Sequence, residues 1–309
     1  MQSVLKTAKQ IKTMEIRGAG AIARAAASAL KEHALSTKTD SLSEFNEEMK
    51  KAAQTLLKTR PTAVSLPNAI RFVMCYQGDT IEKARESIVS LADEFIKRSE
   101  KAVEQIGKIG AKRIRDGDLI MTHCHSSAVV SIIITALKQG KNIGVIATES
   151  RPMMQGHITA QQLSDAGIPT TLIIDSAMRY YMQDVNLAIV GADAIGVNGC
   201  LVNKIGTSQL ALAAHEARVN LLVAAETFKF SPRTIFGELI EIEERSPDEV
   251  LSAQKRKSLK KVTVHNPAFD VTPPEYIDLI CTEVGAIPPE MAYIIIRDYL
   301  GWELEELGI

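Results

Sequence analysis

The sequence lacks the features that mark several large classes of protein. Its four cysteines include no C-x-x-C pair, which argues against a zinc ribbon or a thioredoxin-type motif and favours a reduced, cytoplasmic protein. The most apolar stretch, Ala128–Leu137, is far too short to span a bilayer, and the amino-terminal segment has no signal-peptide core. A net charge of −1 argues against a general nucleic-acid binder, although local basic residues can still bind an anionic substrate. We therefore expect neither a membrane nor a nucleic acid as a partner.

The first part of the chain has the pattern of a helical domain. The length of 309 residues suggests two domains, and we assign residues 1–115 to the first. Ser41 and Glu44 have the spacing of a capping box at a helix start, and Pro61 is expected to end the same helix. Residues 80–116 have the 3.6-residue periodicity of one long amphipathic helix.

The second part of the chain, residues 116–309, has a different pattern. Short apolar segments typical of buried strands alternate with helical segments, and the strands are expected at 118–123, 142–148, 169–175, 187–191 and 219–225. This alternation predicts a doubly wound, mostly parallel, Rossmann-like sheet with helices on both faces. The polar stretch 228–262 is expected to be an insertion of loops and short helices.

Two residues with reactive side chains follow predicted strands. Cys124 and Asp193 each end a β-like run, so both are expected at the carboxyl edge of the sheet, where open α/β sheets bind their ligands. A thiol and a carboxylate there can act as a base and an acid without a metal. A helix predicted directly after Cys124 would favour the thiolate. Alternatively, Cys124 is a small buried side chain in a packed strand, and Asp193 caps a helix.

Two segments have the pattern of anion-binding turns. The glycines of Arg17-Gly-Ala-Gly20 let the backbone approach a phosphate, and Arg17 can clamp it through two hydrogen bonds. Alternatively, the same glycine-rich pattern marks a simple turn between two helices. Asn203-Lys-Ile-Gly-Thr207 is a second candidate before a helix. Further basic candidates, each with surface exposure as the alternative, are Arg60, Arg151 and Lys229.

Seven segments recur together, in this order, in one superfamily. The chain resembles the superfamily that contains methylthioribose-1-phosphate isomerase, archaeal ribose-1,5-bisphosphate isomerase and the regulatory α, β and δ subunits of the eukaryotic initiation-factor-2B exchange factor. The resemblance extends over residues 12–302. The segments are Ile16–Gly20, Thr59–Asn68, Glu149–Pro152, Gly191–Asp193, Asn198–Gly199, Asn203–Thr207 and Asn266–Glu275.

Within the superfamily, the chain is most similar to the archaeal ribose-1,5-bisphosphate isomerases. The translation-factor subunits do not keep the isomerase pair, whereas this chain has both Cys124 and Asp193. The segment Ala224–Phe230 resembles that of the bisphosphate enzymes, and Lys229 within it would suit a second phosphate. Ser127 departs from relatives that carry lysine there, which leaves only a backbone contact to phosphate. The alternatives are a methylthioribose-1-phosphate isomerase and a non-catalytic regulatory subunit.

The resemblance implies a reaction, a set of residues and an assembly. The reaction is the isomerisation of α-D-ribose 1,5-bisphosphate to D-ribulose 1,5-bisphosphate in the salvage of nucleoside phosphates, without a metal or cofactor. The assembly is a homo-oligomer, either a dimer through the α/β domain or a larger form such as a hexamer. Cys124 and Asp193 would be catalytic. The substrate-binding residues would be Arg17, Gly18, Ala19, Gly20, Arg60, His125, Ser126, Ser127, Arg151, Asn203, Lys204 and Lys229.

Overall fold

The chain forms two compact units, Met1–Ala102 and Val103–Ile309, in a computed structural model. The boundary between these units lies inside the long helix α5, Ile81–Ala111, which was predicted as one helix over 80–116. The domain limits 1–115 and 116–309 stay a prediction. The structure describes residues 1–13, 15–16, 18–60, 64–232, 234, 240–259 and 261–300.

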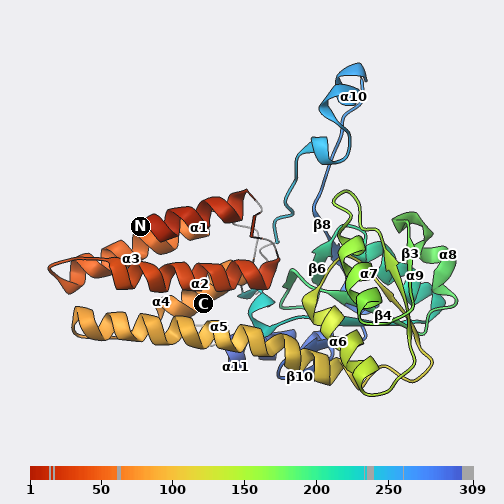
Figure 1. Cartoon of the computed structure of the whole chain (residues 1–309), viewed down its shortest axis with the longest axis horizontal. Coiled ribbons are helices and arrows are strands. Elements are labelled where there is room, and N and C mark those ends of the chain that lie inside the picture. Colours follow the sequence, from red (N-terminus) through yellow and green to blue (C-terminus); the bar gives the residue numbers. More distant parts are fainter. Residues whose placement is uncertain are drawn as a thin grey trace. The chain divides into compact units, whose positions relative to one another are not determined.

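The N-terminal unit is built from helices (Figure 1). Small side chains such as Ala23 and Ala26 are fully buried on α2, which lets this helix pack closely against α4. The predicted cap is present, because Ser41 Oγ accepts a hydrogen bond from the Glu44 N–H at 3.2 Å. The Glu44 carboxylate accepts from the Asp40 N–H, so the reciprocal half of a capping box is displaced by one residue. The helices are α1 Gln2–Lys12, α2 Ala19–Ser36, α3 Leu42–Leu57, α4 Ser65–Met74 and the first part of α5.

The C-terminal unit is centred on a seven-stranded sheet with the order β10-β9-β7-β4-β1-β2-β3. All neighbouring strands are parallel except β10, which pairs antiparallel with β9. The five strands expected from the sequence are all present, and the Rossmann-like fold class is confirmed. Their bounds are β1 Leu119–Thr122, β2 Gly144–Thr148, β3 Thr170–Ile173, β4 Leu187–Gly191 and β7 Asn220–Ala224, and the two further strands are β9 Leu279–Thr282 and β10 Gly285–Ile287.

Helices cover both faces of this sheet, as the alternating pattern predicts. Successive residues of a strand point to opposite faces. On β1, Ile120 is therefore buried against α6 and the end of α5, while Met121 is buried on the face that carries α8, α9 and α11. The helix bounds are α6 Ser127–Lys138, α7 Gln155–Asp165, α8 Met178–Met182, α9 Thr207–Ala217 and α11 Ala292–Leu300.

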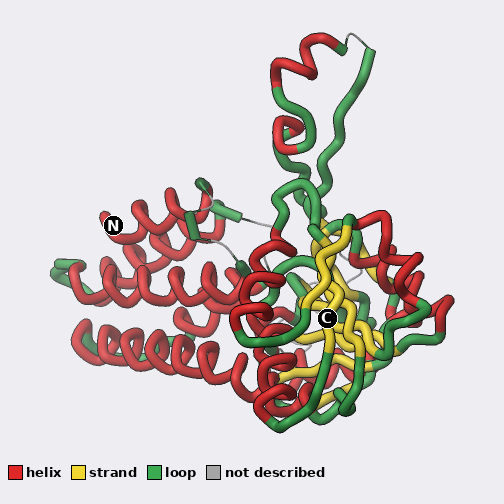
Figure 2. Tube along the Cα trace, turned by 45° about the vertical axis from the view of Figure 1, so that its right-hand side comes forward, coloured by secondary structure: helices red, strands yellow, loops and turns green. Residues whose placement is uncertain are grey.

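A second, smaller sheet was not expected from the sequence. It consists of three antiparallel strands, β5 Ala194–Ile195, β6 Leu201–Lys204 and β8 Phe269–Thr272, in the order β5-β6-β8. Between β7 and β8, the described residues contain short elements, as predicted for 228–262. These are η2 Thr227–Lys229, η4 Pro247–Glu249 and α10 Ala253–Ser258, and α10 lies on an arm that extends away from both sheets (Figure 2).

The described helices include none with the length and apolar character needed to span a bilayer.

Candidate active site

The candidate site lies where the strand order of the large sheet reverses. From β1 the chain proceeds to β2 and β3 on one side, and later to β4, β7 and β9 on the other. Ligands of open α/β sheets bind at the carboxyl ends of the strands at such a point. Cys124 follows β1 and Asp193 follows β4, and these two strands are hydrogen-bonded neighbours. At Gly191 a Cβ atom would come within 2.6 Å of Ser126 Cβ, so the end of β4 approaches the start of α6 as closely as glycine allows.

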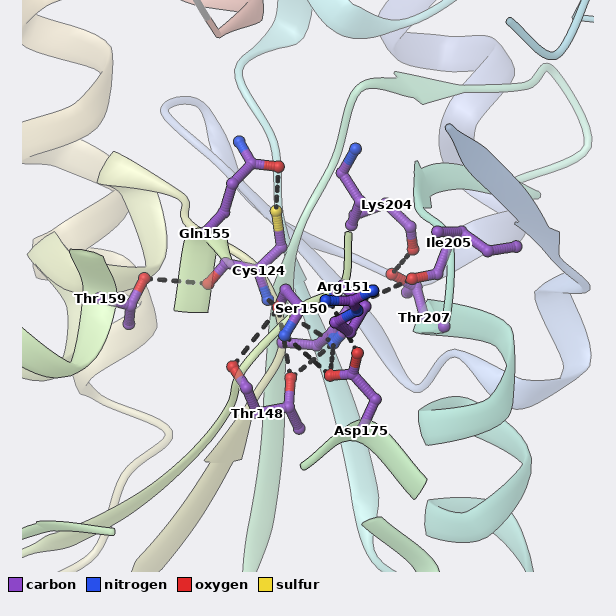
Figure 3. Close-up of polar contacts among 12 residues, drawn as sticks. Cys124, Thr148, Ser150, Arg151, Gln155, Thr159, Asp175, Lys204, Ile205 and Thr207 are labelled. Atoms are coloured by element: carbon purple, nitrogen blue, oxygen red, sulfur yellow. Dashed lines mark hydrogen bonds and ion pairs between the residues drawn. The ribbon is translucent and has the colours of Figure 1, made fainter. Parts of the chain in front are cut away.

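Cys124 sits in an unusual backbone conformation in residues 123–126, which we call the Cys124 elbow. Its φ of 68° lies in the left-handed region, which L side chains rarely adopt. Its N–H donates to Ser150 Oγ at 2.7 Å, and its carbonyl accepts from Thr159 Oγ1 at 2.9 Å. The thiol donates to Gln155 Oε1 at 3.5 Å (Figure 3). Both the backbone and the sulfur of Cys124 are therefore fixed by neighbouring segments.

Burial determines the protonation of Cys124. The pKa of this thiol is raised to about 11, chiefly by burial; the nearby Lys204 ammonium and a backbone hydrogen bond partly oppose the rise, and the negative charges of Asp193 and Asp175 add to it. Cys124 is therefore a neutral thiol at neutral pH. The expectation that the start of α6 would favour the thiolate needs correction, because loss of hydration outweighs the helix terminus.

The Asp193 carboxylate is available to a ligand. The residue is half-buried, and its N–H donates to the Val202 carbonyl at 3.0 Å, which fixes the end of β4 against β6. Asp193 leads into strand β5, so it does not cap a helix. Within the described part of the chain, no group donates a hydrogen bond to its carboxylate.

Lys204 carries a buried positive charge. It is the last residue of β6, it is only 8% exposed, and its Nζ lies 5.1 Å from the centre of the Phe269 ring. No carboxylate of the described residues forms an ion pair with it. A buried charge is normally paired, so an ammonium without a counter-ion beside Cys124 is suited to bind an anionic group of a substrate.

We call residues 204–207 the Lys204 turn. The backbone N–H groups at this turn and the start of α9 bind a carboxylate side chain of the same chain. The carboxylate of Asp270 accepts from the Gly206 N–H at 2.7 Å and from the Ser208 N–H at 3.2 Å. Asn203 donates from Nδ2 to Thr207 Oγ1 at 3.0 Å. A phosphate at the start of α9 would therefore compete with the Asp270 carboxylate for these N–H groups. The substrate-binding roles of Asn203 and Lys204 stay predictions.

The start of α6 has the predicted features. Ser126 is the N-cap, and its Oγ accepts from the Val129 N–H at 3.4 Å. Ser127 is exposed at the first helical position. His125 Nδ1 lies 3.0 Å from Thr159 Oγ1, and burial lowers the pKa of the imidazole, so this ring is neutral near pH 7. A phosphate at this position would meet backbone N–H groups and hydroxyls rather than a cation.

The remaining basic candidates have different surroundings. The Lys229 ammonium is buried 2.6 Å from Glu226 Oε2, so it already has a counter-ion. Arg151 is exposed, and its N–H donates to the Asp175 carboxylate at 2.7 Å. The phosphate-binding roles of Lys229 and Arg151 stay predictions.

Four further candidates belong to the N-terminal unit, and their substrate-binding roles stay predictions as well. Gly18 has a φ of 84° and is the N-cap of α2, so its backbone has the conformation that only glycine adopts without strain. Ala19 and Gly20 form the first turn of this helix, and Arg60 lies after α3. Arg17 lies outside the described residues.

A polar network beneath Cys124 was not identified from the sequence. Ser150 lies in the loop after β2, where its N–H donates to Asp175 Oδ1 at 2.8 Å and its Oγ accepts from Cys124. Gln155 begins α7 (Figure 3). His123 lies between the end of β1 and Cys124. The sequence could have indicated this network through position alone, because its polar residues lie at or after the ends of the strands predicted at 118–123, 142–148 and 169–175.

Comparisons with known proteins agree with this arrangement. The sequence profile of the Initiation factor 2 subunit family, IF-2B, matches residues 15–289. The chain is 55% identical over 302 residues to the ribose 1,5-bisphosphate isomerase of Methanocaldococcus jannaschii, covering 98% of this chain and 97% of that protein. It is 56% identical over 312 residues to the protein of the same name from Archaeoglobus fulgidus, covering 100% and 98%. A crystal structure of Pyrococcus horikoshii OT3 translation initiation factor eIF-2B superposes with a TM-score of 0.80 at 36% identity, covering 93% of this chain and 97% of that one. The chain thus belongs to the initiation factor 2B family.

Proposed function

We propose that the protein is an isomerase that converts α-D-ribose 1,5-bisphosphate to D-ribulose 1,5-bisphosphate. The observation that carries this proposal is the buried Cys124 thiol beside the Asp193 carboxylate and the Lys204 ammonium, of which, among the described residues, the first accepts no hydrogen bond and the second forms no ion pair. Relatives that are more than half identical over nearly the full chain bear the name of this activity. A thiol and a carboxylate suit proton transfer, and the ammonium suits a phosphorylated substrate.

The substrate explains why two proton-transferring groups are required. Its anomeric oxygen carries phosphate, so the sugar cannot open to a free aldehyde. The bond between C1 and the ring oxygen must break as that oxygen gains a proton, while a base removes the proton from C2. The enol phosphate that forms then receives a proton at C1 from the spent base while its C2 hydroxyl gives its proton to the spent acid, which leaves a ketone at C2 and restores both groups.

Cys124 and Asp193 together can supply the acid and the base. In the resting site the proton is on sulfur, because burial raises the pKa of Cys124 to about 11. Transfer of this proton to the Asp193 carboxylate gives a thiolate and a carboxylic acid with no change in net charge. The thiolate then takes the C2 proton, and Asp193 donates to the ring oxygen. The positive charge of Lys204 favours the thiolate and binds a phosphate.

The decisive experiment is an assay of purified protein with ribose 1,5-bisphosphate, with a chelator present and no cofactor added. We expect ribulose 1,5-bisphosphate to form, and methylthioribose 1-phosphate to react more slowly. The matched control is Cys124→Ser, which keeps the shape of the side chain but is a far weaker base near neutral pH. A regulatory subunit would show thermal stabilisation by the sugar phosphate and no ketose, and that outcome would overturn the proposal.

The assembly is a separate part of the proposal. The resemblance implies a cytoplasmic homo-oligomer that binds a sugar bisphosphate and no nucleic acid. Light scattering of the purified protein tests this, because a monomeric mass at working concentration would contradict it.

A further inference from the structure

His123 connects two segments that carry functional side chains. It follows β1 inside the Cys124 elbow, and it is only 2% exposed. One ring nitrogen, Nε2, lies 2.8 Å from the carbonyl oxygen of Ile205 in the Lys204 turn. The other, Nδ1, lies 2.6 Å from Thr148 Oγ1 at the end of β2. A buried ring with both nitrogens engaged can transmit a displacement from one segment to the other.

The partners determine which nitrogen carries the proton. A carbonyl oxygen only accepts hydrogen bonds, so Nε2 must be the protonated nitrogen that donates to Ile205. Burial lowers the pKa of His123, so the ring is neutral and Nδ1 is an acceptor. The Thr148 hydroxyl therefore donates to Nδ1. Nδ1 also lies 3.3 Å from Ser150 Oγ, so both of its neighbours belong to the elbow side, while among the described residues Nε2 contacts only the turn; the two sides can be removed separately.

The contact with Ile205 fixes the peptide next to Lys204. Gly206, with a φ of 101°, lets the turn lie against the imidazole, since a Cβ atom there would be 3.1 Å from His123 Cε1 and Nε2. Any shift of the ring therefore moves the backbone from which the Lys204 side chain extends.

The contact with Thr148 leads to Cys124. Thr148 Oγ1 lies 3.3 Å from Ser150 Oγ, which accepts the Cys124 N–H at 2.7 Å (Figure 3). These hydroxyls support the elbow in its left-handed conformation. The same imidazole thus contributes to the position of the Cys124 sulfur and to that of the Lys204 ammonium.

We propose that His123 is a positioning residue that couples the Cys124 elbow to the Lys204 turn, with Nδ1 serving the elbow and Nε2 serving the turn. This inference rests on the proposed function, since it assigns the elbow to proton transfer and the turn to phosphate binding. It also makes a statement about geometry that can be tested without turnover.

Two substitutions separate the nitrogens. In His123→Gln, the side-chain amide reaches the Nε2 position and can still donate to Ile205, while the Nδ1 acceptor is lost. In His123→Asn, the side-chain oxygen takes the Nδ1 position, while the donor to Ile205 is lost. We expect His123→Gln to lower kcat by up to about 100-fold with little change in KM, because small misplacements of reacting groups have effects of this size. We expect His123→Asn to raise KM about tenfold with little change in kcat, as for loss of one charge-assisted contact.

Thr148→Val provides an independent variant. It removes the hydroxyl that donates to Nδ1 and keeps the shape of the side chain, so it should reproduce the kcat loss of His123→Gln. The double variant of His123→Gln and Thr148→Val should lose no more than either alone, because both act on one contact. His265→Gln is the matched control, since His265 is exposed and lies outside both the elbow and the turn, so it should change neither constant.

Alkylation of Cys124 by iodoacetamide, followed by mass spectrometry, gives a readout that needs no turnover. His123→Gln should speed alkylation at least severalfold, whereas His123→Asn should not. Inorganic phosphate should slow alkylation in wild type and in His123→Gln but not in His123→Asn. If wild type forms no ketose, the proposed function fails, yet these alkylation rates still test the coupling. Equal effects of both variants on kcat, KM and alkylation, together with equally lowered melting temperatures, would refute it and leave His123 with a purely structural role.

Discussion

Replacing Lys204 by methionine should stabilise the empty protein and weaken its binding of substrate. The Lys204 ammonium is buried beside the Phe269 ring with no ion pair among the described residues. Burial of an unpaired ion costs several kcal/mol, and the contact with the ring offsets about 0.5–2 kcal/mol of this. Methionine has a similar length, carries no charge and fits apolar surroundings.

The expected magnitudes follow from this balance. Because the ammonium keeps part of its hydration at 8% exposure, we expect a net gain of about 1–2 kcal/mol in the free energy of unfolding. For a unit of this size, that raises the melting temperature by about 2–8 °C. Loss of the phosphate contact, worth about 1.5–3 kcal/mol, should raise KM about 10-fold to 150-fold.

Differential scanning calorimetry without substrate and steady-state kinetics measure the two effects. The matched control is Lys141→Met, because the Lys141 ammonium donates to the carbonyls of Ala111 and Ile114 at 2.6 and 2.7 Å. Its removal takes the charged donor from both carbonyls, and among the described residues Ala111 keeps only the Ile114 N–H at 3.3 Å, so the melting temperature should fall. A lower melting temperature for Lys204→Met, or an unchanged KM, would show that Lys204 is a structural lysine.

The other predictions concern the acid and base pair and the start of α9. Cys124→Ser should lower kcat by at least about 100-fold, because the alcohol is a poor base, and isothermal calorimetry should still detect substrate binding. Asp193→Asn should have a comparable effect on kcat, since the amide cannot transfer a proton; a change in KM alone would reassign Asp193 to positioning. Because the active pair forms by moving the Cys124 proton to Asp193 without loss of a proton to solvent, kcat/KM should stay level from pH 7 and fall as the pH approaches the thiol pKa of about 11; a rise over this range would show that the thiolate forms by losing its proton to solvent. Folding raises the pKa of Cys124 from 9.0 to about 11, so its contribution to stability is complete below pH 9 and is lost as the pH rises through about 11; denaturant titrations should show the wild type losing stability over this range relative to Cys124→Ser, whose alcohol does not ionise there. Asp270→Asn should lower the free energy of unfolding by about 1–3 kcal/mol, because the N–H groups of Gly206 and Ser208 lose a charged acceptor.

The large sheet could be predicted from the sequence because its signal is local. The segments at β1, β2, β3, β4 and β7 are short apolar runs separated by helical periodicity, and parallel strands buried on both faces have this composition. Strand β9 has four residues, as β1 and β3 do, but it lies in a proline-containing region and pairs with β10 rather than leading into a helix. Strands β10 and β5 have only three and two residues, so they show no clear period and their assignment depends on pairing with other strands.

The sequence predicted where the candidate site lies better than it predicted the protonation states and contacts of its residues. Cys124 and Asp193 follow apolar runs, so their position at one sheet edge required only the topology. The direction of the Cys124 pKa shift required the degree of burial, which no neighbouring residue in the sequence indicates. The occupant of the α9 start is Asp270, which is 64 residues from Gly206 in the sequence. A local motif cannot show that the protein supplies its own anion there.

The neutral state of the Cys124 thiol also affects how fast this side chain reacts with oxidants. With a pKa of about 11, only about one Cys124 side chain in ten thousand is ionised at pH 7. Peroxides and electrophiles react with the thiolate and hardly at all with the thiol, so a cysteine of this kind is converted only slowly to sulfenic and sulfinic acids. A low-pKa cysteine in the same position would be inactivated far sooner. The sheet edge thus provides a sulfur for proton transfer that is protected from oxidative damage while the site is empty.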